Sequence, residues 1–98
     1  MPPNDPTVTV FDPRGHARIV AQTPAPRPTT LDGLRPGVLE NRKANARLLL
    51  ESMVDGLREG ADLGATTTGS KPVAGPASRA TMATLIEECD FVVVGSSD

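Results

Sequence analysis

The sequence has few aromatic side chains and little excess of either charge. Its 98 residues include two Phe and neither Trp nor Tyr. Proteins that hold single-stranded nucleic acid usually stack the bases on aromatic rings, and this chain has almost none. Lys and Arg number 10 against 12 Asp and Glu, so the formal net charge is −2, with the signs intermixed. Because there is no basic stripe for phosphates, the chain is not predicted to bind nucleic acid.

Cysteine, histidine and long apolar runs are equally scarce. The single cysteine, Cys89, excludes an internal disulfide and a multi-cysteine zinc site, and no catalytic constellation can be built around the only histidine, His16. We therefore assign no catalytic residue, no metal ligand and no cofactor. No apolar run is long enough to span a bilayer, and residues 1–6 (MPPNDP) do not resemble a secretory signal. These absences predict a cytoplasmic protein with no membrane partner.

Proline is abundant, and its distribution divides the chain. Eight of the 10 prolines lie at or before position 36, which predicts a Pro-rich N-terminal arm over residues 1–35 and a compact unit over 36–98. Within the arm, residues 7–11 (TVTVF) and 17–20 (ARIV) can pair as a β-hairpin around the turn-forming residues 12–15, or the arm can stay extended. Residues 1–6 and 23–35 are predicted to be poorly ordered on their own.

The compact unit alternates between strand and helix patterns. Residues 36–41 begin as a strand, and a helix is predicted over 43–59 from apolar residues three and four apart: Ala46, Leu49, Leu50, Met53, Val54 and Leu57. A weak strand is predicted next, at 63–68. A second helix is predicted to begin at 75–76, with an apolar stripe of Met82, Leu85, Ile86 and Cys89. The last predicted element is a strand at 91–94 that is buried on both faces. The predicted fold class is α/β, a Rossmann-like βαβαβ parallel-sheet fragment with an N-terminal hairpin or extended arm.

One segment resembles a phosphate-binding P-loop in its composition. Residues 64–71 (GATTTGSK) have two glycines and a lysine, but Ser70 separates the second glycine from Lys71, and Pro72 follows where a helix should begin. The spacing therefore favours a flexible loop flanked by glycines.

Polar residues follow the first and last predicted strands. Asn41, Lys43 and Asn45 lie between the first strand and the first helix, where an anion can bind. Alternatively, Asn41 is the helix N-cap and Lys43 a solvated side chain. Gly95, Ser96, Ser97 and Asp98 after the last strand form either the lip of a ligand site or a frayed end.

Two segments of the compact unit resemble the family of UGSC-motif proteins, which carry a Sec-Gly-Ser-Cys or Cys-Gly-Ser-Cys motif. Residues 37–46 (GVLENRKANA) match at Asn41, Lys43, Asn45 and Ala46, whereas Ala44 stands where the family often has proline and Glu40 where it often has Asp. Residues 87–98 (EECDFVVVGSSD) resemble the segment that leads directly into the motif. The resemblance covers residues 35–98.

The resemblance implies thiol- or selenol-type redox chemistry at a motif that these 98 residues do not contain. Selenocysteine is encoded by UGA, which is ordinarily read as a stop, so we expect an N-terminal portion truncated just before the motif and not catalytic by itself. Two alternatives remain open: a non-enzymatic module that pairs with another chain or with its own copy through exposed sheet edges, and a module that binds a small anionic molecule. The resemblance implies no particular substrate.

Overall fold

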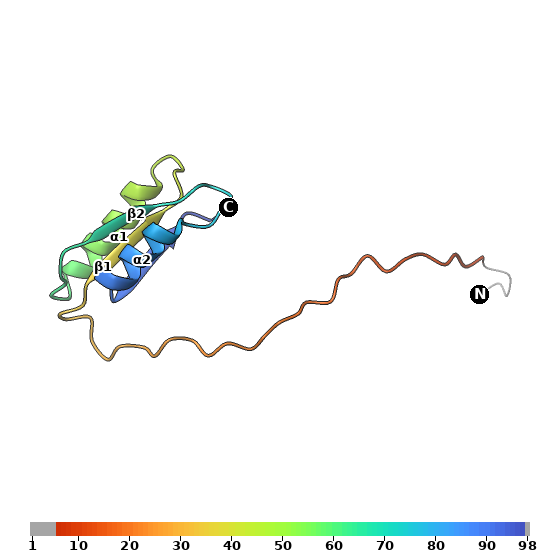
Figure 1. Cartoon of the computed structure of the whole chain (residues 1–98), viewed down its shortest axis with the longest axis horizontal. Coiled ribbons are helices and arrows are strands. Elements are labelled where there is room, and N and C mark those ends of the chain that lie inside the picture. Colours follow the sequence, from red (N-terminus) through yellow and green to blue (C-terminus); the bar gives the residue numbers. More distant parts are fainter. Residues whose placement is uncertain (1–5, 98) are drawn as a thin grey trace.

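The computed structural model describes residues 6–97, and five elements follow one another in the predicted order (Figure 1). Their bounds are β1 (Pro36–Glu40), α1 (Ala46–Arg58), β2 (Thr67–Ser70), α2 (Arg79–Glu88) and β3 (Phe91–Gly95). All three strands are parallel, in the order β2-β1-β3. The α/β class and the βαβαβ order are therefore confirmed. Neither helix in the described part of the chain is long and apolar enough to cross a membrane.

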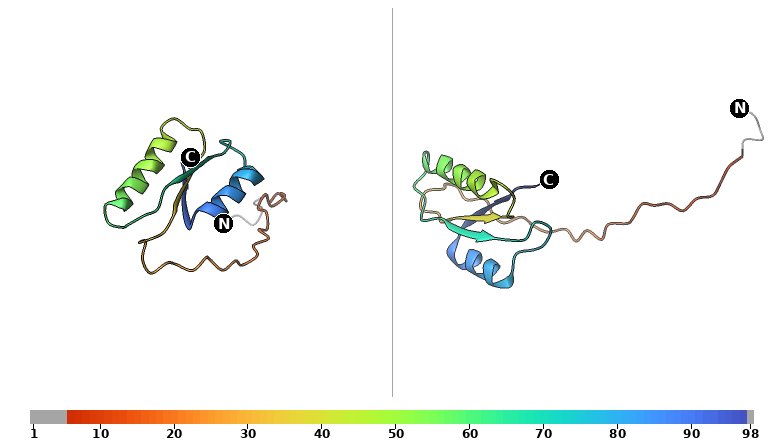
Figure 2. Two further views of the ribbon diagram at one scale, coloured as in Figure 1. Left: turned by 60° about the vertical axis from the view of Figure 1, so that its left-hand side comes forward. Right: turned by 90° about the horizontal axis from the view of Figure 1, so that it is seen from above.

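The two helices lie on opposite faces of the sheet (Figure 2). α1 packs against β1 and β3, whereas α2 packs against β2. The core lies on the α1 face, where Val38 of the central strand is fully buried against Leu50 and Val54 of α1 and Leu63. Because β1 has a strand on each side and a helix on each face, it is the most buried element.

The predicted apolar stripe of α1 is only half buried. Ala46, Leu50 and Val54 face the sheet and are buried, but Leu49, Met53 and Leu57 are exposed. The stripe is wider than the sheet beneath it, since β3 is an edge strand with no further strand beside it in the described chain. The pattern found the helix correctly and overestimated how much of it the sheet covers.

The α2 face is less well covered than predicted. Leu85 is the only buried residue of α2, while Met82 and Ile86 are exposed and Cys89 is half-buried. The prediction that residues 91–94 are buried on both faces is also wrong, because Val94 is exposed. Both errors have one cause: α2 packs over β2 and leaves the α2-side face of β3 open.

The second strand lies later in the chain than predicted. β2 occupies residues 67–70 and pairs with β1 from Gly37↔Thr67 to Glu40↔Ser70. The prediction of a flexible loop over 64–71 is therefore wrong for residues 67–70, which form the strand. The pairing extends beyond the strand, since the Lys71 amide donates a 2.9 Å hydrogen bond to the Glu40 carbonyl. This contact holds Lys71 at the carboxyl end of the sheet.

The arm stays extended and forms no hairpin. Residues 6–30 are exposed and contain no strand, and the described arm runs away from the sheet (Figure 1). A two-stranded hairpin with no face to bury is at best marginally stable, which explains its absence. Residues 31–34 are ordered against the core, contrary to prediction: Gly33 donates to the Asp62 carbonyl at 2.7 Å, and Leu31 and Leu34 pack on the buried cluster. The predictions for residues 1–5 and Asp98 lie outside the described residues.

An ion pair closes the amino end of the sheet. The Arg35 amide and its Nε donate to Asp90 Oδ2 at 2.7 and 3.1 Å, and the Asp90 amide donates back to the Arg35 carbonyl at 2.8 Å. These hydrogen bonds from Arg35 hold the pKa of the Asp90 carboxyl below its usual value. β1 and β3 are thus fastened together at the end opposite the candidate site.

Candidate functional site

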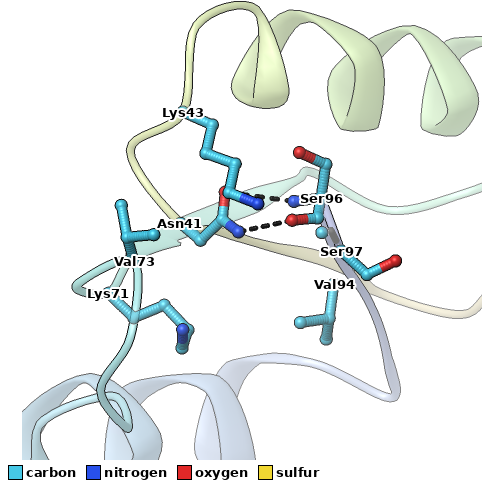
Figure 3. Close-up of a pocket in the computed structure, with 8 residues that line it drawn as sticks. Asn41, Lys43, Lys71, Val73, Val94, Ser96 and Ser97 are labelled. Atoms are coloured by element: carbon cyan, nitrogen blue, oxygen red, sulfur yellow. Dashed lines mark hydrogen bonds between the residues drawn. The ribbon is translucent and has the colours of Figure 1, made fainter.

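A polar pocket lies at the carboxyl ends of the strands, where ligands bind in open α/β sheets (Figure 3). Its volume is about 270 Å³, and it opens between the segment after β1, the segment after β2 and the end of β3. It is lined by Asn41, Lys43, Lys71, Val73, Val94, Gly95, Ser96 and Ser97.

One side of the pocket is built on a pair of hydrogen bonds between β1 and β3. Asn41 Nδ2 donates to the Ser96 carbonyl at 2.6 Å, and the Ser96 amide donates to Asn41 Oδ1 at 3.1 Å (Figure 3). The Asn41 amide also donates to the Gly95 carbonyl at 3.0 Å. The Asn41 side chain, only 8% exposed, therefore continues the ladder beyond the strands. Its interpretation as the α1 N-cap is wrong; Asn45 is the N-cap and makes no side-chain cap hydrogen bond.

The pocket contains both lysines of the sequence. Lys43 precedes α1 and Lys71 follows β2, and Figure 3 shows their side chains on either side of the Asn41–Ser96 pair. Lys71 Nζ donates a hydrogen bond to the Pro72 carbonyl at 2.8 Å, so its partner in that contact is an uncharged oxygen. Among residues 6–97 no carboxylate lines the pocket. Both lysine side chains are part of the described lining.

The loop that presents Lys43 has a defined backbone. Arg42 and Asn45 both adopt left-handed conformations, with φ of 63° and 62°, which is uncommon outside glycine and costs least for Asn. The Arg42 conformation is supported locally: its amide donates to Glu40 Oε2 at 2.6 Å and its Nε to Ser70 Oγ at 3.2 Å. A hydrogen bond with Ser70, and then the Arg42 amide, hold the pKa of Glu40 below its usual value. These contacts fix the loop between β1 and α1.

The structure brings together most of the predicted site residues. Asn41, Lys43, Gly95, Ser96 and Ser97 line one pocket, whereas Asn45 only caps α1 and Asp98 lies outside the described residues. Whether these residues bind a ligand stays a prediction. The sequence analysis missed Lys71, Val73 and Val94 as pocket residues. The one available signal was Lys71 itself, the second of only two lysines, at the end of a segment that resembled a phosphate loop.

Cys89 lies away from this pocket. It follows α2, and a Cβ at Gly37 in β1 would come within 2.7 Å of its Sγ. Within residues 6–97 no three His, Cys, Asp or Glu side chains gather as metal ligands. The pocket thus offers ammonium and hydroxyl groups, which suit an anion, rather than the ligand set of a metal.

The fold and the site define an α/β protein with a polar pocket, lined by both lysines, at the carboxyl edge of a parallel sheet. Comparison with protein families identifies it more closely: the family model described as the UGSC family matches residues 9–98, and the chain belongs to this family. The match includes most of the arm as well as the α/β unit. No curated protein and no solved structure matches the chain.

Proposed function

We propose that this chain binds a small anionic molecule in the pocket at the carboxyl ends of β1 and β3, as the N-terminal part of a UGSC-type domain. The observation that carries the proposal is the convergence of both lysines, 43 and 71, on one pocket that no described carboxylate lines. Lysines placed at random on a domain of this size would be spread over its surface, since an ammonium group is strongly hydrated.

The topology supports the same location. The chain passes from β1 through α1 to β2, which lies on one side of β1. It then passes from β2 through α2 to β3, which lies on the other side of β1, so the strand order is β2-β1-β3. The crossovers diverge on either side of β1, and in doubly wound sheets ligands bind where the order reverses. We propose on this basis that the sheet is the first part of a Rossmann-like domain and that the pocket is its ligand crevice.

The pocket chemistry limits the ligand to a small anion. The Asn41 side-chain amide is engaged with Ser96, and we propose that the ligand contacts the Lys43 and Lys71 ammonium groups and the exposed Ser97 hydroxyl of the lining. Val73 and Val94 form an apolar part of the lining. A carboxylate or phosphate group between the lysines, with a short apolar portion against the valines, fits this lining.

Replacing Lys71 by Met is expected to weaken anion binding about tenfold, because a charge-assisted hydrogen bond contributes ~1.5–3 kcal/mol. The measurement is an NMR titration of the 98-residue chain with inorganic phosphate and, separately, with acetate, at constant ionic strength. Lys43→Met is expected to act in the same direction. Arg47→Met is the matched control, since Arg47 is exposed on α1 and pairs with Glu51 at 2.8 Å.

Two results of this titration would contradict the proposal. The first is that neither probe shifts the amide signals of Ser96 and Ser97. The second is that Arg47→Met weakens binding as much as Lys71→Met does. The second result would show that the anions respond to the overall charge of the chain and not to the pocket.

A second candidate function is the thiol- or selenol-type redox chemistry that the family resemblance implies. The observation that favours it is the position of Ser96 and Ser97, which line the pocket directly after β3. A reactive motif joined after Asp98 would follow Ser96 and Ser97, which line the same pocket as both lysines. Cys89, the only cysteine, faces Gly37 instead and cannot supply this chemistry at the pocket.

Extending the chain after Asp98 by Cys-Gly-Ser-Cys is expected to create a thiol that reacts faster with a disulfide reagent than Cys89 does. Lys43→Met and Lys71→Met in the extended chain should slow that reaction at neutral pH, because loss of a nearby positive charge raises a thiol pKa. The pH dependence of the labelling rate measures this, with Arg47→Met again as the control. If the pH dependence of the labelling rate is unchanged in both lysine variants, the motif does not react beside the pocket. That result would not contradict the anion-binding proposal.

A further inference from the structure

The two lysines of the pocket directly follow two residues that are hydrogen-bonded to each other. Lys43 follows Arg42 and Lys71 follows Ser70 in the sequence. Arg42 Nε donates a hydrogen bond to Ser70 Oγ at 3.2 Å, across 28 positions of the chain. Neither Arg42 nor Ser70 lines the pocket. The hydrogen bond therefore joins the two segments that carry the lysines without itself forming part of the lining.

Glu40 of β1 bonds to both of these segments. Its Oε2 accepts a hydrogen bond from the Arg42 amide at 2.6 Å, and its carbonyl accepts one from the Lys71 amide at 2.9 Å. A hydrogen bond with the Ser70 hydroxyl is the largest cause that holds the pKa of Glu40 below its usual value, so its carboxyl group is ionised at neutral pH. The register of the sheet brings these groups together, since Glu40 is the partner of Ser70 in the pairing of β1 with β2.

The backbone of Arg42 depends on this support. Its φ of 63° lies in the left-handed region, which residues other than Gly, Asn and Asp rarely adopt. Glu40 accepts the Arg42 amide and Ser70 accepts its side chain, so both parts of the residue are held in place. Because Lys43 is the next residue, a change of φ at Arg42 redirects the chain that carries Lys43. Backbone conformations that persist only through surrounding contacts are concentrated at functional sites.

We propose that Glu40, Arg42 and Ser70, which we call the positioning cluster, set the distance between the two lysines and thereby the affinity of the pocket for its anion. The inference rests on the anion-binding function proposed above. The members of the cluster are positioning residues, because none of them lines the pocket. A binding site is selective only when its contacting groups are held close to one geometry, and the positioning cluster supplies that constraint for Lys43 and Lys71.

The charge of Glu40 allows this role to be separated from simple electrostatics. Replacing Glu40 by a neutral residue makes the net charge of the chain more positive by one. By Coulomb's law alone, that change favours anion binding. Loss of the positioning contacts has the opposite effect, because it releases the segments that carry Lys43 and Lys71. The sign of the change in affinity therefore identifies the mechanism.

Glu40→Ala is expected to weaken binding of inorganic phosphate and of acetate about fivefold, although the chain becomes more positive. Glu51→Ala is the matched control: it changes the charge equally, and the Glu51 carboxylate pairs with Arg47 on α1. It should leave the affinity unchanged or slightly higher. Glu40→Gln keeps an oxygen that accepts the Arg42 amide and should recover part of the loss. The measurement is an NMR titration of the 98-residue chain at constant ionic strength, at a temperature where circular dichroism shows each variant to be folded.

Two further substitutions examine the other members of the positioning cluster. Ser70→Ala changes no charge and is expected to weaken binding, whereas Thr66→Val, which removes a hydroxyl bonded to Arg58 at 2.8 Å just before β2, should not. Glycine adopts a φ near 63° without strain, so an Arg42→Gly chain no longer needs Glu40 to hold this conformation. Glu40→Ala should therefore lose most of its effect in the Arg42→Gly background, as coupled residues do in a double-mutant cycle.

The outcomes separate this inference from the proposed function. Unchanged or tighter anion binding in Glu40→Ala would overturn the positioning role, while anion binding at the pocket would stand as long as Lys71→Met weakens it. Equal losses in Ser70→Ala and Thr66→Val would also overturn the positioning role, because they would reflect a general loss of structure in β2. Absence of phosphate and acetate binding by the unmodified chain would refute the proposed function and this inference together.

Discussion

Replacing Asn41 by Ala is expected to lower the free energy of unfolding by about 2 kcal/mol, because leaving buried hydrogen-bonding groups without partners costs ~1–3 kcal/mol. The substitution removes both hydrogen bonds between the Asn41 side chain and the main chain of Ser96, at 2.6 and 3.1 Å. It also releases the end of β3 that forms one side of the pocket. Urea denaturation followed by circular dichroism measures the change in stability.

Two control variants identify the interaction responsible. Ser96→Ala should leave the stability nearly unchanged, because Asn41 bonds the amide and carbonyl of Ser96 and not its hydroxyl. Asn45→Gly should be neutral or slightly stabilising, since Asn45 has a φ of 62° and makes no side-chain cap hydrogen bond. A loss with Ser96→Ala as large as with Asn41→Ala would contradict the role given to the Asn41 side chain.

The same variant bears on ligand binding. Both lysines remain in Asn41→Ala, so any loss of phosphate binding by folded protein reports on the shape of the pocket and not on its charge. We expect weaker binding with Lys43 and Lys71 present, because Ser96 and Ser97 are no longer held against β1. Titration at a temperature where the variant is fully folded separates this effect from unfolding.

The sequence predicted the order of elements because β1, α1 and β3 carry strong apolar patterns. β2 was misplaced for a physical reason: its residues, Thr67–Ser70 (TTGS), include no large apolar side chain. Its position is set by pairing along the free side of β1 and by close contact with α2. A Cβ at Gly69 would come within 2.8 Å of Thr81 Cγ2. Neither contact can be inferred from a local pattern.

Only some residues of the candidate site could be predicted from the sequence, for the same reason. Asn41, Lys43 and Ser96 follow strands that the pattern identified, and the carboxyl ends of parallel strands meet at one edge. Lys71 follows the strand that was predicted at 63–68 and lies at 67–70, so its place in the pocket was missed. The pairing of Asn41 with Ser96 joins residues 55 positions apart, and only the register of β1 with β3 brings them together.

Burial was overestimated wherever the prediction assumed a complete sheet. Leu49, Met53, Ile86 and Val94 all belong to correct apolar patterns, yet all are exposed, and no strand lies beside the outer edge of β3 in the described part of the chain. A periodic pattern identifies the residues of an apolar face, but it does not identify the element that packs against that face.

Introducing a side chain at Gly37 is expected to destabilise the domain by about 1–3 kcal/mol for Ala and by more for Val, as overpacking of a core does. Gly37 lies in the central strand, and an added Cβ would lie 2.7 Å from Cys89 Sγ and 2.9 Å from Val92 Cγ2. Val92 is β-branched and stiff at χ1, so it cannot rotate away easily. Glycine at this position allows the chain after α2 to approach β1 closely.

A double-mutant cycle tests whether Cys89 is the packing partner that requires this glycine. Cys89→Ala alone should cost about 1 kcal/mol at most, because the side chain is small and only half-buried. In the Cys89→Ala background the shortest contact is removed, so Gly37→Ala should cost ~1 kcal/mol less than it does in the wild-type chain. The free energies of unfolding of the four proteins in urea give the coupling. Strict additivity would show that Val92 alone restricts position 37, and Cys89 would then have no packing role against β1.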